Sequence, residues 1–283
     1  LVLMYFWIGV PTVYRYSGPD MPPPHFYNNP ELPGFVSTPS DMPGRSIKNI
    51  VIYAFYFVPN DKTQTIRSEW KSTLEEDLGK LRDFHALQFA GRSEITLLIY
   101  PEPIIGVHDT RFYDSESTAR GNPHALDATT EEINARVFKK NGDRTRDDFK
   151  RQANAYPVFF VYYEGMGASG GIIIERESSA PDDIARELNI SESTIFETDV
   201  ALAEGFFLIG TDILTGEENE YRSSTIIAHE FYHTIGLQDT YTPSPKSGGA
   251  ERVSSLDIMG SGRYTPLEKT FLDRRWLAGF GMH

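Results

Sequence analysis

Hydrophobic positions in the first half of the chain follow two different periods, and this pattern predicts strands that alternate with helices. Residues 47–58 are β-branched and aromatic with little polar alternation, which is typical of a strand covered on both faces. Within 70–84 the apolar residues recur at three- and four-residue steps, so we expect a helix there, with Ser68 as its cap. A second apolar run covers 95–105. A strand, a helix and a strand in this order predict a right-handed parallel crossover unit.

Polar and charged residues dominate the middle of the chain, from 106 to 155. We expect two helices in this region, at 129–140 and 143–155, and Thr129 and Glu132 have the spacing of a capping box. The charged side chains of these helices are expected to form solvated faces.

Apolar strands return at 157–165, 170–178 and 205–214, with a short acidic helix at 181–189 before the last of them. The first two runs are separated by a glycine-rich turn, which favours a hairpin-like link. Strands and helices that alternate in this way predict the α/β (α+β) class, with a mixed sheet and helices packed on it. One of these strands should form an edge of the sheet.

The first 46 residues differ in composition from the rest, so we divide the chain into an N-terminal part, 1–46, and a main domain, 47–283. Residues 1–10 are an unbroken apolar run, about half of the roughly twenty residues that cross a bilayer. Three interpretations stay open for this run: the stub of a membrane anchor or signal segment, a buried strand, or an element of a propeptide. Segment 17–44 holds eight of the 18 prolines and is expected to be an extended linker.

Composition limits the classes of partner and of site. The formal net charge of −13 at pH 7 argues against nucleic acid as a partner. The chain has no cysteine, so neither disulfides nor a thiolate zinc site is possible, and the cellular compartment stays open on this ground. The length of 283 residues is enough for one sizeable core.

The clearest chemical motif lies in 225–241. His229 and His233 stand four residues apart, so on a helix their rings project from the same face and can bind one Zn²⁺. Glu230 leaves the helix about a hundred degrees from His229, in reach of a water on the metal but outside the ligand set. This spacing predicts Glu230 as a general base.

A catalytic zinc site normally has three protein ligands, and the residues after His233 indicate the third. Gly236 follows three residues later, and glycine allows a helix to end in a left-handed turn. The chain can then return past the metal and bring Asp239 within reach. The complete string is HExxHxxGxxD, with one catalytic zinc ion on His229, His233 and Asp239.

The motif resembles that of the metzincin clan of zinc peptidases, whose chains later pass beneath the metal in a methionine-containing turn. Residues 257–262, DIMGSG, place Met259 where that Met-turn is expected. The combination with 236–241, GLQDTY, is similar to the immune inhibitor A (thuringilysin) group and secondarily to the snapalysins, which also use an aspartate ligand. Gln238 stands where the immune inhibitor group would have proline.

The resemblance implies a metzincin-like catalytic domain over 47–283. Its upper subdomain, about 47–236, would contain a twisted mixed sheet, helices and the active-site helix. Its lower subdomain, about 237–283, would be small and irregular and would end in a C-terminal helix. Met259 would form an apolar floor under the histidines, and Tyr264 is a candidate for stabilising the oxyanion.

The C-terminal helix is also expected from the residues themselves. Thr265 can cap it, Pro266 suits its first position and Glu268 completes a capping box. A helix over 266–278 would then end at Gly279.

The sequence leaves two further metal interactions open. In some metzincin zymogens a carboxylate of the pro-segment binds the metal, so 17–44 is alternatively a pro-segment that offers Asp20 or Asp41. Calcium is compatible with the composition, but His108 and Asp109 match no known calcium motif.

Together these features predict a zinc-dependent endopeptidase in which Glu230 takes a proton from water and passes it to the leaving amine. The expected partner is a protein or peptide bound extended along an edge strand. The enzyme would be a monomer, extracellular, and either secreted or anchored at the surface through its N-terminus. Two alternatives stay open: a zinc-dependent amidase or esterase with a non-peptide substrate, and a vestigial zinc-stabilised interaction module. Retention of Glu230 argues against the second.

Overall fold

The computed structural model describes most of the main domain and three residues of the N-terminal part. The described residues are 4–6, 47–118, 121–138, 155–175, 202–215, 223–237, 239, 242–243, 250–251, 256–273 and 276–277. The helix expected at 181–189 lies outside them, as do Asp20, Asp41 and all of 143–155 except Ala155. Within the described part, every helix is too short or too polar to cross a bilayer.

The described residues contain a seven-stranded mixed sheet with the order β1-β6-β7-β5-β2-β3, in which β4 also pairs with β2. The strands β2, β3, β4, β5 and β7 are parallel, whereas β6 is antiparallel to β7 and β1 is antiparallel to β6. This confirms the α/β class and a mainly parallel mixed sheet. The strand bounds are β1 Met4–Phe6, β2 Asn49–Val58, β3 Glu94–Ile99, β4 Ile104–Ile105, β5 Ala155–Tyr163, β6 Ala168–Glu175 and β7 Leu202–Gly210.

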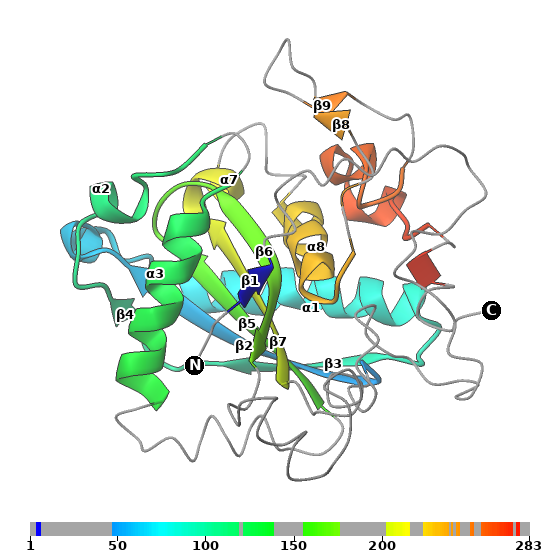
Figure 1. Ribbon diagram of the computed structural model, residues 1–283, viewed down its shortest axis with the longest axis horizontal. Helices are drawn as coiled ribbons and strands as arrows, with labels where there is room; N and C mark the ends of the chain where they lie inside the picture. Colours follow the sequence, from blue (N-terminus) through cyan, green and yellow to red (C-terminus); the bar gives the residue numbers. More distant parts are fainter. Residues whose placement is uncertain are drawn as a thin grey trace, which may run out of the picture.

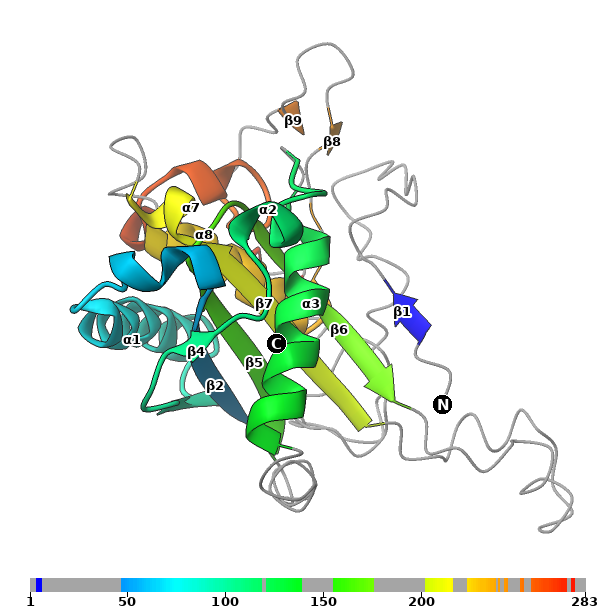
Figure 2. The ribbon, with the colours of Figure 1, turned by 90° about the vertical axis from the view of Figure 1, so that its left-hand side faces the viewer.

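Helices cover both faces of the sheet (Figures 1 and 2). The long helix α1 (Trp70–Gln88) and helix α8 (Ser223–Thr234) lie on one face, and α3 (Pro123–Ile133) packs on the other. The shorter elements are η1 Asn60–Thr65, α2 Thr110–Tyr113, the π-helix η2 Asn134–Phe138, α7 Thr211–Thr215, β8 Thr242–Pro243, β9 Ala250–Glu251, η3 Ser261–Tyr264 and η4 Leu267–Lys269. The expected crossover unit is confirmed, since α1 links the parallel strands β2 and β3.

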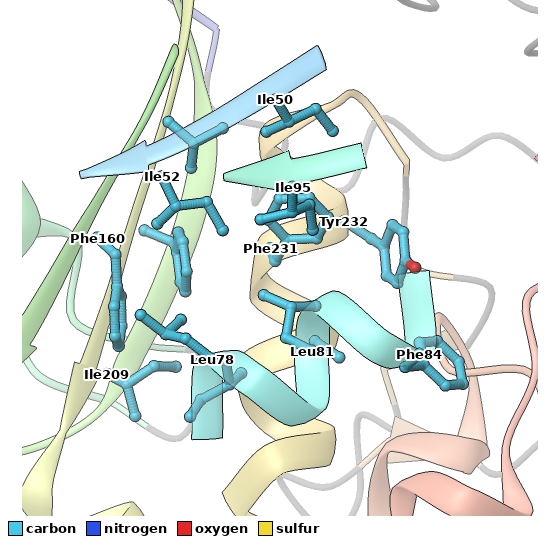
Figure 3. Close-up of a cluster of buried hydrophobic side chains, with 14 of the residues drawn as sticks. Ile50, Ile52, Leu78, Leu81, Phe84, Ile95, Phe160, Ile209, Phe231 and Tyr232 are labelled. Atoms are coloured by element: carbon cyan, nitrogen blue, oxygen red, sulfur yellow. The ribbon is translucent and has the colours of Figure 1, made fainter. Parts of the chain in front are cut away.

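The buried strands alternate their side chains between two cores. Along β2, Ile50 and Ile52 face α1 and α8, whereas Val51 and Phe55 face α3. Figure 3 shows the first core, in which side chains of α1 and α8 meet those of the sheet. Its labelled members are Ile50, Ile52, Leu78, Leu81, Phe84, Ile95, Phe160, Ile209, Phe231 and Tyr232. Since both faces of β2 are buried, the continuous apolar pattern at 47–58 is explained.

Two strand predictions were wrong in detail. The hairpin-like link after 157–165 does not form, because β7 lies between β5 and β6. Aromatic stacking favours this arrangement: the rings of Phe160 in β5 and Phe207 in β7 lie 4.3 Å apart between centroids. The run 95–105 is also split into β3 and β4, because Pro101 and Pro103 interrupt it and proline cannot donate to a ladder.

The predicted helix starts at Ser68 and Thr129 were wrong as well. Helix α1 has no side-chain cap, since Ser68 donates to Glu69 Oε2 instead. Helix α3 begins earlier than expected, after Asn122, whose side chain accepts from the Ala125 amide at 3.1 Å. Thr129 therefore lies inside this helix and donates to the carbonyl of Ala125 at 2.7 Å.

The single C-terminal helix expected over 266–278 was also wrong. Pro266 precedes only the short 3₁₀ turn η4, which Thr270 closes by donating to the Leu267 carbonyl at 2.8 Å. Phe271 cannot continue a helix, because its backbone pairs with the turn that precedes η3: it donates to the Leu256 carbonyl and accepts from the Ile258 amide. Only 276–277 are helical among the described residues that follow.

A buried histidine connects α1 to α8. The side chain of His85 is fully buried, and its Nε2 lies 2.7 Å from Ser93 Oγ, which itself donates to the Ile47 carbonyl at 2.5 Å. Since the only hydroxyl proton of Ser93 is used, His85 Nε2 is the donor and its Nδ1 is free to accept from Tyr232 Oη at 3.4 Å. His85 is therefore a packing residue of the core.

This arrangement predicts a pH-dependent stability. Burial lowers the pKa of His85 from 6.5 to about 3. Below pH 6.5 the imidazole of His85 is protonated in the unfolded chain but stays neutral in the folded chain. The free energy of unfolding therefore falls as the pH drops from 6.5 towards 3. For this one group we expect a loss of about 2 kcal/mol between pH 7 and pH 5. Urea unfolding at the two pH values measures the loss. A His85→Gln variant should lose less, and an equal loss in both proteins would contradict the prediction.

Candidate metal centre

Helix α8 is fixed in the fold by contacts with other parts of the protein, independently of any ligand. Its residues Ile227, Ala228 and Phe231 are fully buried against the sheet and α1. At its first turn Ser224 donates to the buried carboxylate of Asp77 in α1 at 3.1 Å, and Thr225 donates to the Thr265 carbonyl at 2.8 Å. Figure 1 shows α8 beside β6 near the centre of the molecule. The helix is thus a rigid support for side chains that project from it.

Both motif histidines are oriented by backbone carbonyls. His229 Nδ1 lies 2.9 Å from the Ile258 carbonyl, and His233 Nδ1 lies 2.8 Å from the Leu237 carbonyl. A carbonyl can only accept, so each Nδ1 carries a proton and each Nε2 faces the group, where a metal ion would take the place of any proton that Asp239 attracts to it. The two Nε2 atoms lie 3.3 Å apart, and both rings are buried. Metal-binding histidines almost always donate their other ring N–H in this way.

The predicted glycine turn ends the helix and returns the chain to the histidines. Gly236 has φ +96°, the left-handed conformation that glycine adopts without steric cost. Its amide donates to the His233 carbonyl, and the Leu237 amide donates to the Tyr232 carbonyl at 3.1 Å. The reversal brings Asp239 Oδ1 to 3.2 Å from His229 Nε2 and 3.5 Å from His233 Nε2. The expected convergence of the three side chains is confirmed.

These three atoms fit a tetrahedral metal ion. With zinc at about 2.0–2.2 Å from nitrogen and oxygen ligands, neighbouring ligand atoms in a tetrahedron lie about 3.3–3.6 Å apart. The observed separations of 3.2, 3.3 and 3.5 Å lie in that range or within about 0.1 Å of it. The side chain of Asp239 is 31% exposed, whereas the imidazoles are almost closed to solvent, so the group opens on the aspartate side. Among the described residues, the group of His and acidic side chains that lie close enough together to hold a metal ion is His229, His233 and Asp239.

Charges in the group favour a cation. Burial alone would lower the pKa of His233, but the nearby carboxylates of Asp239 and Glu230 outweigh it and raise that pKa to about 9. Loss of hydration alone would raise the pKa of Asp239, but the charge of His233 and hydrogen bonds from both histidines hold it well below 3.8. The carboxylate is therefore ionised at neutral pH and attracts positive charge to the point between the two rings.

The turn that contains Met259 contacts the site through one backbone carbonyl. Met259 is fully buried in the core, and the residue before it, Ile258, supplies the carbonyl that orients His229. Asp257 shapes this turn, because its carbonyl accepts from the amides of Gly260 and Gly262. Its carboxylate also accepts from Trp276 Nε1 at 3.3 Å. Asp257 is therefore a structural residue of this turn.

Glu230 lies on the side of α8 that approaches strand β6. Its Oε2 lies close to Gly170: a Cβ built on that glycine would stand 3.2 Å from Oε2 and 2.4 Å from the Glu230 carbonyl oxygen. The side chain is half-buried, and its charge contributes to the raised pKa of His233. Glu230 therefore stands near the ligand group without belonging to it.

Other candidates from the sequence have different positions. The hydroxyl of Tyr264 accepts from Arg263 Nη2 at 2.6 Å, so its oxyanion role stays a prediction. Asp109 caps α2 by accepting from the Phe112 amide at 3.0 Å, and His108 stacks on the Phe112 ring. This pair is accounted for by the local structure of α2.

Gly170 was missed as a site residue from the sequence. A usable signal was present, since two adjacent glycines within an apolar strand often mark a close approach of another backbone. The approaching element, however, is about 60 positions away in sequence, so the pattern alone could not identify it.

No protein-family model matches the chain, and no curated protein matches it.

Proposed function

We propose that this chain is a zinc-dependent endopeptidase with a metzincin-like active site. The observation that carries the proposal is the convergence of His229 Nε2, His233 Nε2 and Asp239 Oδ1 at tetrahedral spacing, with Glu230 next to the ligands. Backbone carbonyls at Nδ1 already orient both imidazoles with Nε2 towards the group, as a metal needs. A site that only stabilised the fold would gain nothing from an ionisable residue beside the ligands.

The roles of the residues follow from their chemistry. His229, His233 and Asp239 would hold the ion, and the open side at Asp239 leaves room for water and substrate. When bound, zinc supplies Lewis acidity for a water molecule and for the scissile carbonyl. Glu230 accepts a proton from the attacking water and transfers it to the leaving amine. Met259 keeps the base of the site dry, and Tyr264 is a candidate donor to the oxyanion.

Strand β6 is the best candidate for binding an extended peptide. It runs antiparallel to its neighbour β7, packs against α8, and passes Glu230 at Gly170. Its outer edge is occupied by β1, which pairs antiparallel to it with Phe6 opposite Ile172, so β6 is not the free edge strand that was expected and a bound peptide would take the place of β1. Main-chain pairing along such an edge would let the enzyme bind many sequences with the same hydrogen bonds. The resemblance further favours an extracellular monomer.

Chelation and reconstitution test the proposal. The purified chain is expected to contain close to one zinc per molecule by mass spectrometry and to hydrolyse a quenched peptide library. Removal of the ion with a chelator should abolish hydrolysis, and stoichiometric zinc should restore it. A library of esters and non-peptide amides separates the amidase or esterase alternative. A chain that binds zinc but hydrolyses none of these substrates would support the vestigial interaction module instead.

A further inference from the structure

Helix α8 approaches the sheet unusually closely at two glycines. A Cβ on Gly170 in β6 would lie 2.4 Å from the Glu230 carbonyl oxygen, and a Cβ on Gly205 in β7 would lie 2.5 Å from Thr234 Cβ. Carbon atoms do not approach other heavy atoms so closely without displacement of one of them. Both positions therefore depend on the absence of a side chain.

The two glycines match the repeat of the helix. In the β6–β7 ladder Gly170 pairs with Phe207 and Gly205 pairs with Ile172, so the glycines are offset by two residue pairs. Two residues of a strand cover about 6.6 Å, and the four residues from Glu230 to Thr234 cover about 6 Å of helix axis. One face of α8 thus rests on both strands at successive turns.

The far end of this contact is fixed by further hydrogen bonds. Tyr156 in β5 donates to the Thr234 carbonyl at 2.6 Å, and Thr234 donates to the Phe231 carbonyl at 2.6 Å. The opposite side of α8 is fixed by the Ile258 carbonyl on His229. The helix is therefore held on several sides, and the position of Glu230 relative to the ligands depends on how closely β6 approaches it.

We propose that Gly170 is a positioning residue for Glu230. Because Gly170 has no side chain, β6 packs closely against α8, and this contact fixes the Glu230 carboxylate beside the ligand group. This inference rests on the proposed peptidase function and adds a residue that acts through the general base. Gly170 has no part in holding the ion, because the three ligands are oriented by the carbonyls of Ile258 and Leu237 and by the turn at Gly236.

The adjacent glycine provides a matched control. A Cβ on Gly171 would meet nothing within 4 Å, since alternate residues of a strand point to opposite faces. Gly170→Ala and Gly171→Ala thus add the same methyl group to the same strand, one residue apart. Only the first forces Glu230 and β6 apart.

For Gly170→Ala we expect kcat to fall about 10- to 100-fold, because a displacement of less than 1 Å at a reacting group has effects of this size. KM and the zinc affinity, measured by chelator competition, should stay within about threefold of wild type. Gly171→Ala should behave as wild type in all three measurements. A loss confined to kcat is what distinguishes positioning of Glu230 from general damage to the strand.

The remaining outcomes overturn the inference. It fails if Gly170→Ala keeps the wild-type kcat, if both alanine variants lose kcat equally, or if the loss lies in KM or zinc binding. If Gly170→Ala does not fold, the Glu230→Asp variant tests the inference in its place. Aspartate withdraws the carboxylate by one methylene and adds no atom between α8 and β6. A near-native kcat in this variant would refute the need for precise placement of the carboxylate. An inactive wild type would refute the proposed function and this inference with it, whereas an active wild type with an equally active Gly170→Ala refutes the inference alone.

Discussion

Replacing Glu230 by glutamine is expected to lower kcat for peptide hydrolysis by about 10²- to 10⁴-fold, the usual contribution of a general acid–base residue. Glutamine keeps the shape of glutamate but cannot take the proton of the attacking water. The ligands His229, His233 and Asp239 are untouched, so zinc should stay bound. Initial rates on a peptide substrate and zinc content by mass spectrometry measure the two effects separately.

Glu268→Gln is a suitable control for this experiment. Glu268 is an exposed residue of η4, and its replacement removes the same charge away from the ligand group. It should leave kcat unchanged. The mechanism would have to be abandoned if Glu230→Gln retained more than about a tenth of the wild-type kcat, since another group would then be the base.

Replacing Asp239 by alanine is expected to have the largest effect on metal binding. Two imidazoles alone leave an incomplete ligand set, and the charge that neutralises the ion is lost. Because only the folded chain presents all three ligands, zinc at a thousandfold excess over Kd should stabilise the wild type by about 4 kcal/mol. This stabilisation should be absent in Asp239→Ala at the same zinc concentration.

Thermal unfolding with and without zinc measures the difference. Asp83→Ala serves as the control, because Asp83 is an exposed carboxylate on α1, with 73% of its side chain accessible. That variant should respond to zinc as the wild type does. An Asp239→Ala protein that took up zinc with wild-type affinity would show that the third ligand has been misassigned.

The parts of the structure that depend on local sequence were predictable. The pair His229 and His233 followed from the helical repeat, and the left-handed turn followed from Gly236, because each depends on residues only a few positions apart. The same holds for β2 and α1, whose long apolar patterns leave little choice of element. The convergence of Asp239 with the histidines could be anticipated because a single tight turn separates them.

Features that depend on distant partners were not predictable. The wrong hairpin after 157–165 came from a local turn signal, whereas the order of strands is decided by stacking between β5 and β7. The helix signals at Thr265, Pro266 and Glu268 were complete, but the backbone of Phe271 is engaged by the turn before η3. In both cases a contact far away in sequence outweighed a correct local preference.

The carbonyl that orients His229 has a consequence for biosynthesis. It belongs to Ile258, which the ribosome adds 29 residues after the histidine itself. The strands of the sheet and α8 all precede this acceptor in the sequence, so the Ile258 carbonyl can fix the His229 tautomer only after the segment that carries it has been synthesised and has docked. A chain truncated before Ile258 would therefore keep the strands of the sheet and α8 but would lack the carbonyl that orients His229.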